Sequence, residues 1–142
     1  MKKGFILLLS LAVIGIFTGC DLNIKLTFEN VKGEWLFPDI DTIKGTAVKN
    51  VGLSVMGDSE NDVMLDIRWT TVDTDTYYLY NSNGSFEGNV FTGLYYLSSD
   101  MGTTFDISVE FTGDGETGTA TFSGEGVLDG LVFEKGNVTK TD

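Results

Sequence analysis

The chain has 142 residues, a formal net charge of −12, one cysteine and no histidine. Its length suits one domain with a modest core, and nine basic residues against 21 acidic ones leave no basic stripe that would bind a nucleic acid. The missing histidine removes the commonest general base and the usual serine triad, and a single cysteine excludes a disulfide within the chain.

The first twenty residues have the order of an export signal. Two lysines precede an apolar run over residues 4–17, and two small residues then lead to Cys20. A basic start, a short apolar core and small residues at its end are typical of a cleavable signal peptide. The apolar core is shorter than the about 20 residues that a transmembrane helix needs, although an uncleaved N-terminal anchor is the competing interpretation.

Thr18, Gly19 and Cys20 resemble the lipobox of bacterial lipoproteins, with Phe17 where that motif usually has leucine. The resemblance implies that residues 1–19 are a lipoprotein signal peptide and that Cys20 carries a diacylglycerol thioether. Residues 20–142 would then form one domain of the cell envelope, held by lipid on the extracytoplasmic side of a membrane that it does not span. The alternative for Cys20 is an ordinary buried thiol.

Residues 20–142 have the pattern of an all-β domain. The chain contains 18 glycines and one proline, and we find no window with helical apolar spacing after Cys20. Alternation over residues 22–28 predicts a first strand, residues 33–37 a second that Pro38 stops, and residues 45–56 a third. Residues 63–71 give the clearest signal, since Val63, Leu65, Ile67 and Trp69 share one face.

The second half of the chain continues in the same way. Asn81-Ser82-Asn83-Gly84 predicts a hairpin turn between strands at 77–80 and 85–97, and Gly88 and Gly93 mark bends in the latter. Further strands are predicted at 105–111, 117–123 and 127–134. The connecting turns are predicted at 39–42, 57–62, 73–75, 98–102, 113–116 and 124–126.

About eight to ten strands with short connections predict an antiparallel up-and-down meander. A meander hides its edges best by closing, so we expect a closed β-barrel, with a β-sandwich as the alternative. Gly33-Glu34-Trp35 resembles the Gly-x-Trp of the first strand in lipocalin and avidin-like barrels. That resemblance implies that Trp35 plugs the closed end of the barrel.

Acidic pairs in the predicted turns offer two kinds of chemistry: Asp39/Asp41, Glu60/Asp62 and Asp73/Asp75. Paired carboxylates serve in glycosidases, and oxygen-rich loops bind calcium. None of these loops matches the twelve-residue calcium motif, and aspartate in turns commonly accepts hydrogen bonds from the local backbone. We therefore expect no catalytic residues, no metal site and no cofactor.

Five tyrosines on two predicted neighbouring strands are the candidate ligand-binding residues: Tyr77, Tyr78, Tyr80, Tyr95 and Tyr96. Rings with a polar tip line many pockets, although cross-strand packing on the surface of a sheet is the favoured explanation of these tyrosines. The expected function is non-enzymatic binding of a small apolar ligand or a partner protein in the envelope. The alternative is a structural or surface-exposed lipoprotein that acts through protein contacts without a ligand cavity.

Overall fold

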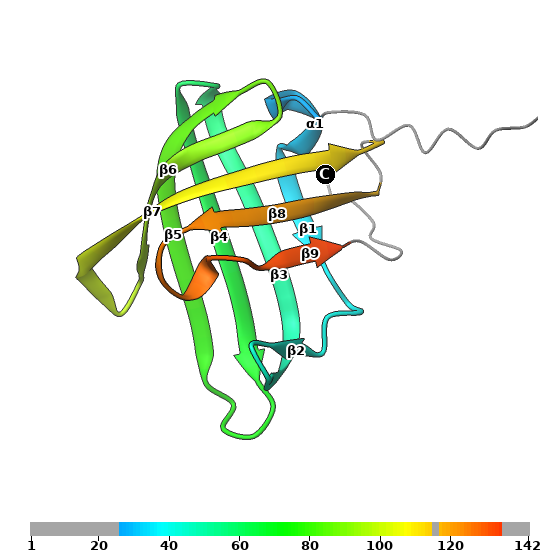
Figure 1. The fold of residues 1–142 in the computed structure, drawn as a ribbon, viewed down its shortest axis with the longest axis vertical. Helices are drawn as coiled ribbons and strands as arrows, with labels where there is room; N and C mark the ends of the chain where they lie inside the picture. Colours follow the sequence, from blue (N-terminus) through cyan, green and yellow to red (C-terminus); the bar gives the residue numbers. More distant parts are fainter. Residues whose placement is uncertain (1–25, 115–116, 135–142) are drawn as a thin grey trace, which may run out of the picture.

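The computed structural model describes residues 26–114 and 117–134, which form a curled antiparallel sheet of nine strands (Figure 1). One helical turn, α1 (Phe28–Val31), precedes the sheet, and a 3₁₀ turn, η1 (Gly126–Leu128), interrupts its end. The strands are β1 (Gly33–Leu36), β2 (Thr42–Ile43), β3 (Thr46–Ser59), β4 (Asp62–Thr71), β5 (Tyr77–Glu87), β6 (Val90–Leu97), β7 (Asp100–Gly113), β8 (Gly118–Gly124) and β9 (Val132–Glu134).

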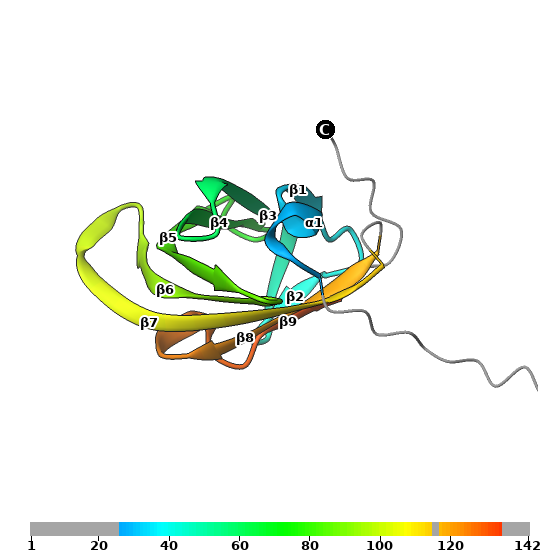
Figure 2. The same cartoon turned by 90° about the horizontal axis from the view of Figure 1, so that it is seen from above.

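The predicted up-and-down meander is confirmed, because β1 and then β3 to β9 pair in chain order and every pairing is antiparallel. The short β2 pairs with β3 beside this path. The sheet curls into a half-barrel in which β7, β8 and β9 cross in front of β3, β4 and β5 (Figures 1 and 2). Within the described residues β1 and β9 do not pair with each other, so strand pairing alone does not give the closed barrel that we predicted.

The concave face holds the core. On β4, every second residue from Val63 to Trp69 is buried, as its alternation predicts. The two ends of the sheet meet at a seam. Phe37, just after β1, and Phe133 of β9 have rings 5.2 Å apart, and the N–H of Leu26, just before α1, donates to the carbonyl of Phe111 in β7 at 3.5 Å. An apolar void beside this seam has a volume of only about 10 Å³, room for no more than one water. The buried apolar side chains of the described residues form one cluster, which occupies the concave face.

A transverse row of residues allows the sheet to curl. Across β3 to β8 the register aligns Gly57, Val63, Gly84, Gly93, Ile107 and Gly124. At the centre of this row the backbones of β5 and β6 approach so closely that side chains are excluded. A Cβ on Gly84 would lie 2.0 Å from the Thr92 carbonyl oxygen, and one on Gly93 2.2 Å from that of Asn83. Gly93 thus marks the close approach of two strands at the curl.

The strand predicted over residues 22–28 is wrong at its described end. Phe28 begins α1 instead, and the hydroxyl and the backbone N–H of Thr27 both donate to Oδ1 of Asn30, at 2.7 and 3.3 Å. Both Leu26 and Phe28 are nevertheless buried. Their apolar character thus predicted burial correctly, whereas their alternate spacing predicted the wrong secondary structure. Residues 22–25, the predicted signal peptide over residues 1–19 and the predicted lipidation site Cys20 lie outside the described residues.

The hairpin turn predicted at residues 81–84 is also wrong, because these residues lie inside β5 and pair on both sides. Asn81 turns its amide outward to donate to Oδ1 of Asp66 at 2.6 Å. The predicted strand 85–97 is in fact two strands, and the chain reverses at Gly88, where φ is 63°. Asn89 stabilises this reversal, since its buried amide donates to the Phe111 carbonyl at 3.0 Å.

Other boundaries shift without changing the topology. The strand predicted at 127–134 begins as η1, and only Val132–Glu134 pair with β8. The turn predicted at 39–42 ends in β2, and that predicted at 57–62 is shorter because β3 extends to Ser59. No helix in the described part of the chain is long and apolar enough to cross a bilayer.

Replacing Gly93 by alanine is expected to destabilise the fold by about 2 to 3 kcal/mol, because the new methyl group would clash with backbone rather than with a flexible side chain. Chemical denaturation measures this loss. Gly102→Ala is the matched control: at Gly102 a Cβ would meet nothing closer than Oδ1 of Asp100, at 3.4 Å, so a change within about 0.5 kcal/mol is expected. Equal stability of the two variants would contradict the role given to the glycine row.

Candidate functional site

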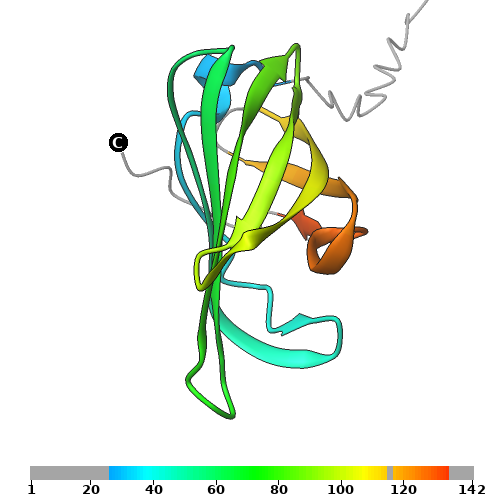
Figure 3. The same cartoon turned by 90° about the vertical axis from the view of Figure 1, so that its left-hand side faces the viewer.

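An aromatic cleft of about 180 Å³ opens at one end of the half-barrel. It lies among the β2–β3 hairpin, the adjoining ends of β4 and β5, and η1, whereas α1 lies at the opposite end of the long axis (Figures 1 and 3). Its lining residues are Ile43, Lys44, Thr46, Trp69, Thr71, Tyr78, Tyr80 and Val127.

Three rings form the aromatic floor of the cleft: Trp69, Tyr78 and Tyr80. Trp69 and Tyr78 are direct cross-strand partners on β4 and β5, with ring centroids 5.8 Å apart. Tyr80 lies 5.1 Å from Trp69, and its ring is nearly parallel to that of Tyr78, at 6°. Trp69 and Tyr80 are buried while Tyr78 is half-buried, so Tyr78 offers more of its ring to a ligand.

The Tyr80 hydroxyl in this floor is neutral at physiological pH. Burial, with smaller contributions from the neighbouring hydroxyls of Tyr78 and Tyr95, raises its pKa to about 12. Neutral rings present their electron-rich faces to a bound group, which suits apolar and C–H-rich surfaces. The floor therefore favours a ligand with an apolar ring or a short apolar chain.

A tight hairpin forms one wall of the cleft. Ile43 pairs with Thr46 across the two central residues Lys44 and Gly45, whose φ angles of 46° and 81° are those of a type I′ turn. The Ile43 side chain is buried and anchors the hairpin to the core. A register shift in β3 next to Asn50, where φ is 57°, alters the direction of this part of the strand.

The β4–β5 connection beside the cleft is fixed by hydroxyl groups. Oγ1 of Thr74 lies 2.6 Å from that of Thr71 and 2.8 Å from that of Thr76. The backbone N–H of Thr76 also donates to Oγ1 of Thr71, at 3.0 Å. Lys49 ties β3 to the same connection through Oδ1 of Asp75, at 2.6 Å, and this hydrogen bond lowers the pKa of the Asp75 carboxyl. The strand that carries Tyr78 therefore begins directly after a loop that several hydrogen bonds hold in place.

The structure divides the five predicted tyrosines among three places. Tyr78 and Tyr80 line the cleft, whereas Tyr95 lies behind it in the core, edge-on to Tyr80 at 5.9 Å. The Tyr95 hydroxyl donates to the Glu125 carbonyl at 2.7 Å and accepts from the Leu128 N–H at 3.4 Å, while burial raises its pKa. Tyr77 and Tyr96 lie on the outer face, because neighbours along a strand alternate.

Sequence reasoning missed most of the walls of the cleft. Gly45 is the residue that could have indicated a turn between Ile43 and Thr46, since glycine is common in turns. Val127 had no such signal, since it was assigned to a strand and lies in η1 instead. Trp69 was expected in the core and is buried there, with one edge lining the cleft.

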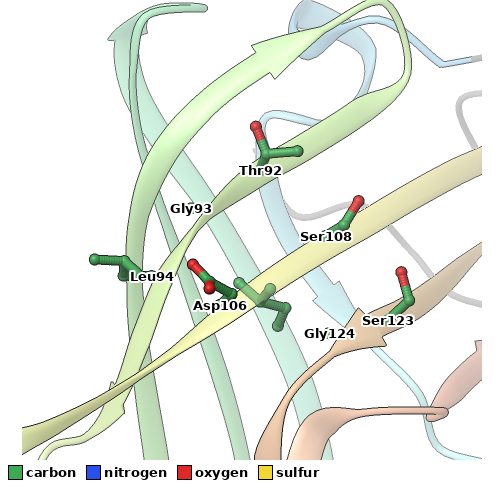
Figure 4. A pocket seen from close by; sticks show the side chains of 8 residues that line it. Thr92, Gly93, Leu94, Asp106, Ser108, Ser123 and Gly124 are labelled. Atoms are coloured by element: carbon green, nitrogen blue, oxygen red, sulfur yellow. The ribbon is translucent and has the colours of Figure 1, made fainter.

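A second, wider depression of about 560 Å³ lies over β6, β7 and β8 (Figure 4). Thr92, Ser108 and Ser123 are aligned in register and project from the three strands, while Phe91, Val109 and Phe122 beside them are buried in the core. The depression is therefore on the outer face. Leu94, Asp106 and Ile107 line it beside hydroxyl side chains and glycine backbone, but no aromatic ring does.

Within the described residues, no group of three or more histidine, cysteine, aspartate or glutamate side chains is placed to hold a metal ion. Comparisons of the chain with protein-family models, with curated proteins and with solved structures found no match. The aromatic cleft combines rings, enclosure and a charged side chain, and is therefore our candidate site.

Proposed function

We propose that this chain is a non-enzymatic, lipid-anchored binding protein of the cell envelope, on the extracytoplasmic side. Its aromatic cleft would hold a small apolar ligand, or an apolar group of a partner protein. The cleft of about 180 Å³ carries the proposal, because an apolar cavity of about 150 Å³ is known to accept benzene. A ring with a short substituent therefore fits, and a drug-sized molecule, for which pockets of about 300 Å³ or more are usual, does not.

The filled interior supports binding at the end of the sheet rather than inside it. Contacts across the seam, such as that between Phe37 and Phe133, shield the core from solvent. We propose that the half-barrel functions as a closed barrel in which side chains, rather than β1–β9 hydrogen bonds, complete the wall. Such a barrel serves as a rigid support for the cleft.

The proposed lipid on Cys20 would direct the cleft away from the bilayer. Cys20 precedes Leu26 by six residues, a span of at most about 20 Å. Phe28 of α1 contacts Phe86, whose backbone N–H donates to the Glu60 carbonyl, so the acidic β3–β4 connection lies at the same end as α1. Its carboxylates would keep this end from adhering to anionic lipids.

A second candidate is an envelope protein that acts through surface contacts without a small ligand. Three apolar side chains on the outer face favour it: Met64, Leu94 and Leu36 are each close to half exposed. Exposed apolar side chains contribute to protein interfaces, although scattered ones are also common on monomers.

Cys20→Ser is expected to abolish lipid attachment, since an alcohol cannot form the thioether. Mass spectrometry of the protein from bacterial membranes, together with fractionation, measures the outcome. The native chain should begin at acylated Cys20 and remain with membranes, while the variant should carry no lipid. Native protein that retains residues 1–19 and an unmodified thiol would contradict the anchor.

Tyr78→Ala is expected to weaken binding of a neutral aromatic probe, phenylacetamide, at least about fivefold, because the most accessible ring of the floor is lost. The measurement is ¹⁹F NMR of the full-length protein, labelled with 5-fluorotryptophan and held in lipid nanodiscs. The protein has two tryptophans, Trp35 and Trp69, so the spectrum contains two signals. The Trp69 signal should shift and the Trp35 signal should not.

Tyr77→Ala is the matched control, since Tyr77 is the neighbouring residue on the opposite face and is 57 % exposed. It should leave the affinity unchanged, and thermal unfolding of both variants would separate lost binding from lost folding. A Trp69 signal that never responds to the probe would count against the cleft and in favour of the contact-only alternative.

A further inference from the structure

The cleft is lined by a lysine whose ammonium group has no partner among the described residues. Four basic side chains lie in the described residues, and three of them have partners: Lys49 with Asp75 at 2.6 Å, Arg68 with Glu34, and Lys32 over the ring of Phe28 at 5.5 Å. In residues 26–114 and 117–134, only the ammonium group of Lys44 has neither an ion pair nor a ring contact. Lys44 is exposed and lines the aromatic cleft.

The backbone at Lys44 makes the choice of lysine unexpected. Its φ of 46° lies in the left-handed region, where asparagine, aspartate or glycine is favoured at the first central position of a type I′ turn. Lysine therefore fits this turn worse than asparagine would, and no described ion pair compensates for it. A residue that breaks a local rule without a structural gain indicates a functional constraint.

We propose that the ligand of the cleft is a small amphiphilic anion: an aromatic ring or short apolar chain that carries one carboxylate. The apolar part would lie on Trp69, Tyr78 and Tyr80, and the carboxylate would pair with Lys44. This inference rests on the proposed function, because it names the ligand class of the same cleft. The volume of about 180 Å³ excludes a long acyl chain from the cleft.

The net negative charge of the protein increases the preference of an anion for this cleft over the rest of the surface. A formal net charge of −12 repels anions at long range, but charges separated by more than about 8 Å are largely screened at physiological salt. A carboxylate in contact with Lys44 escapes most of this repulsion, whereas the other described cations are held in an ion pair or, for Lys32, over the ring of Phe28. An anion that also has an apolar group to place on the rings would therefore bind at this cleft in preference to the rest of the described surface.

The test compares phenylacetate with phenylacetamide, which have nearly the same shape and differ in charge. In the ¹⁹F titration of the full-length protein, phenylacetate should bind about fivefold more tightly, the size expected of an exposed ion pair. Lys44→Gln should bring the two affinities together by weakening phenylacetate alone, and Lys44→Arg should preserve the preference. Lys32→Gln, which changes a cation beside α1, should leave the preference intact.

The outcomes separate this inference from the proposed function. If both probes shift the Trp69 signal with equal affinity, or if Lys44→Gln leaves the preference for phenylacetate unchanged, the carboxylate assignment is wrong and the apolar cleft stands. If neither probe shifts the Trp69 signal, the ligand function and the inference both fail. Raising the salt concentration should reduce the phenylacetate affinity only, as expected for a screened ion pair.

Discussion

The close approach of β5 and β6 at Gly84 and Gly93 determines how far the whole sheet can curl. Neither position has room for a Cβ, because each would meet the carbonyl oxygen of the opposite strand at about 2 Å. A sheet with side chains at this level would be forced apart and flatter. The glycines allow it to curl, which brings β7–β9 over β3–β5 and lets one set of side chains fill the space between them. The buried side chains on the concave face support our proposal that a ligand binds at the end of the sheet.

Alternation predicted the meander well, because a half-buried strand displays its pattern within its own residues. Val63 to Trp69 are the clearest example. It failed at Asn81-Ser82-Asn83-Gly84, where composition favours a turn but hydrogen bonds to two neighbouring strands prevail. The cost is visible in Ser82, whose buried hydroxyl has no hydrogen-bond partner among the described residues. Tertiary pairing of this kind is not visible in a local window.

The candidate site was predictable in part for the same reason. Alternation distinguishes Tyr78 and Tyr80 from Tyr77, since they fall on opposite faces of β5. It does not reveal that Tyr95 lies behind Tyr80, or that η1 brings Val127 to the cleft. These placements depend on how far the sheet curls and on where the last strand is interrupted. Lys44 is different. Gly45 beside it indicates a turn, but only the structure shows which carboxylates pair with the other basic side chains and that none pairs with Lys44.

If side chains fill the curled sheet, an apolar molecule should bind at its end and not inside it. Intermolecular nuclear Overhauser effects between phenylacetamide and methyl-labelled full-length protein in nanodiscs distinguish these two positions. They should connect the probe to the methyl groups of Ile43 and Val127, which line the cleft. Contacts to Leu53 and Leu65, which are fully buried in the core, would show instead that the interior opens to admit a ligand, and would contradict the account.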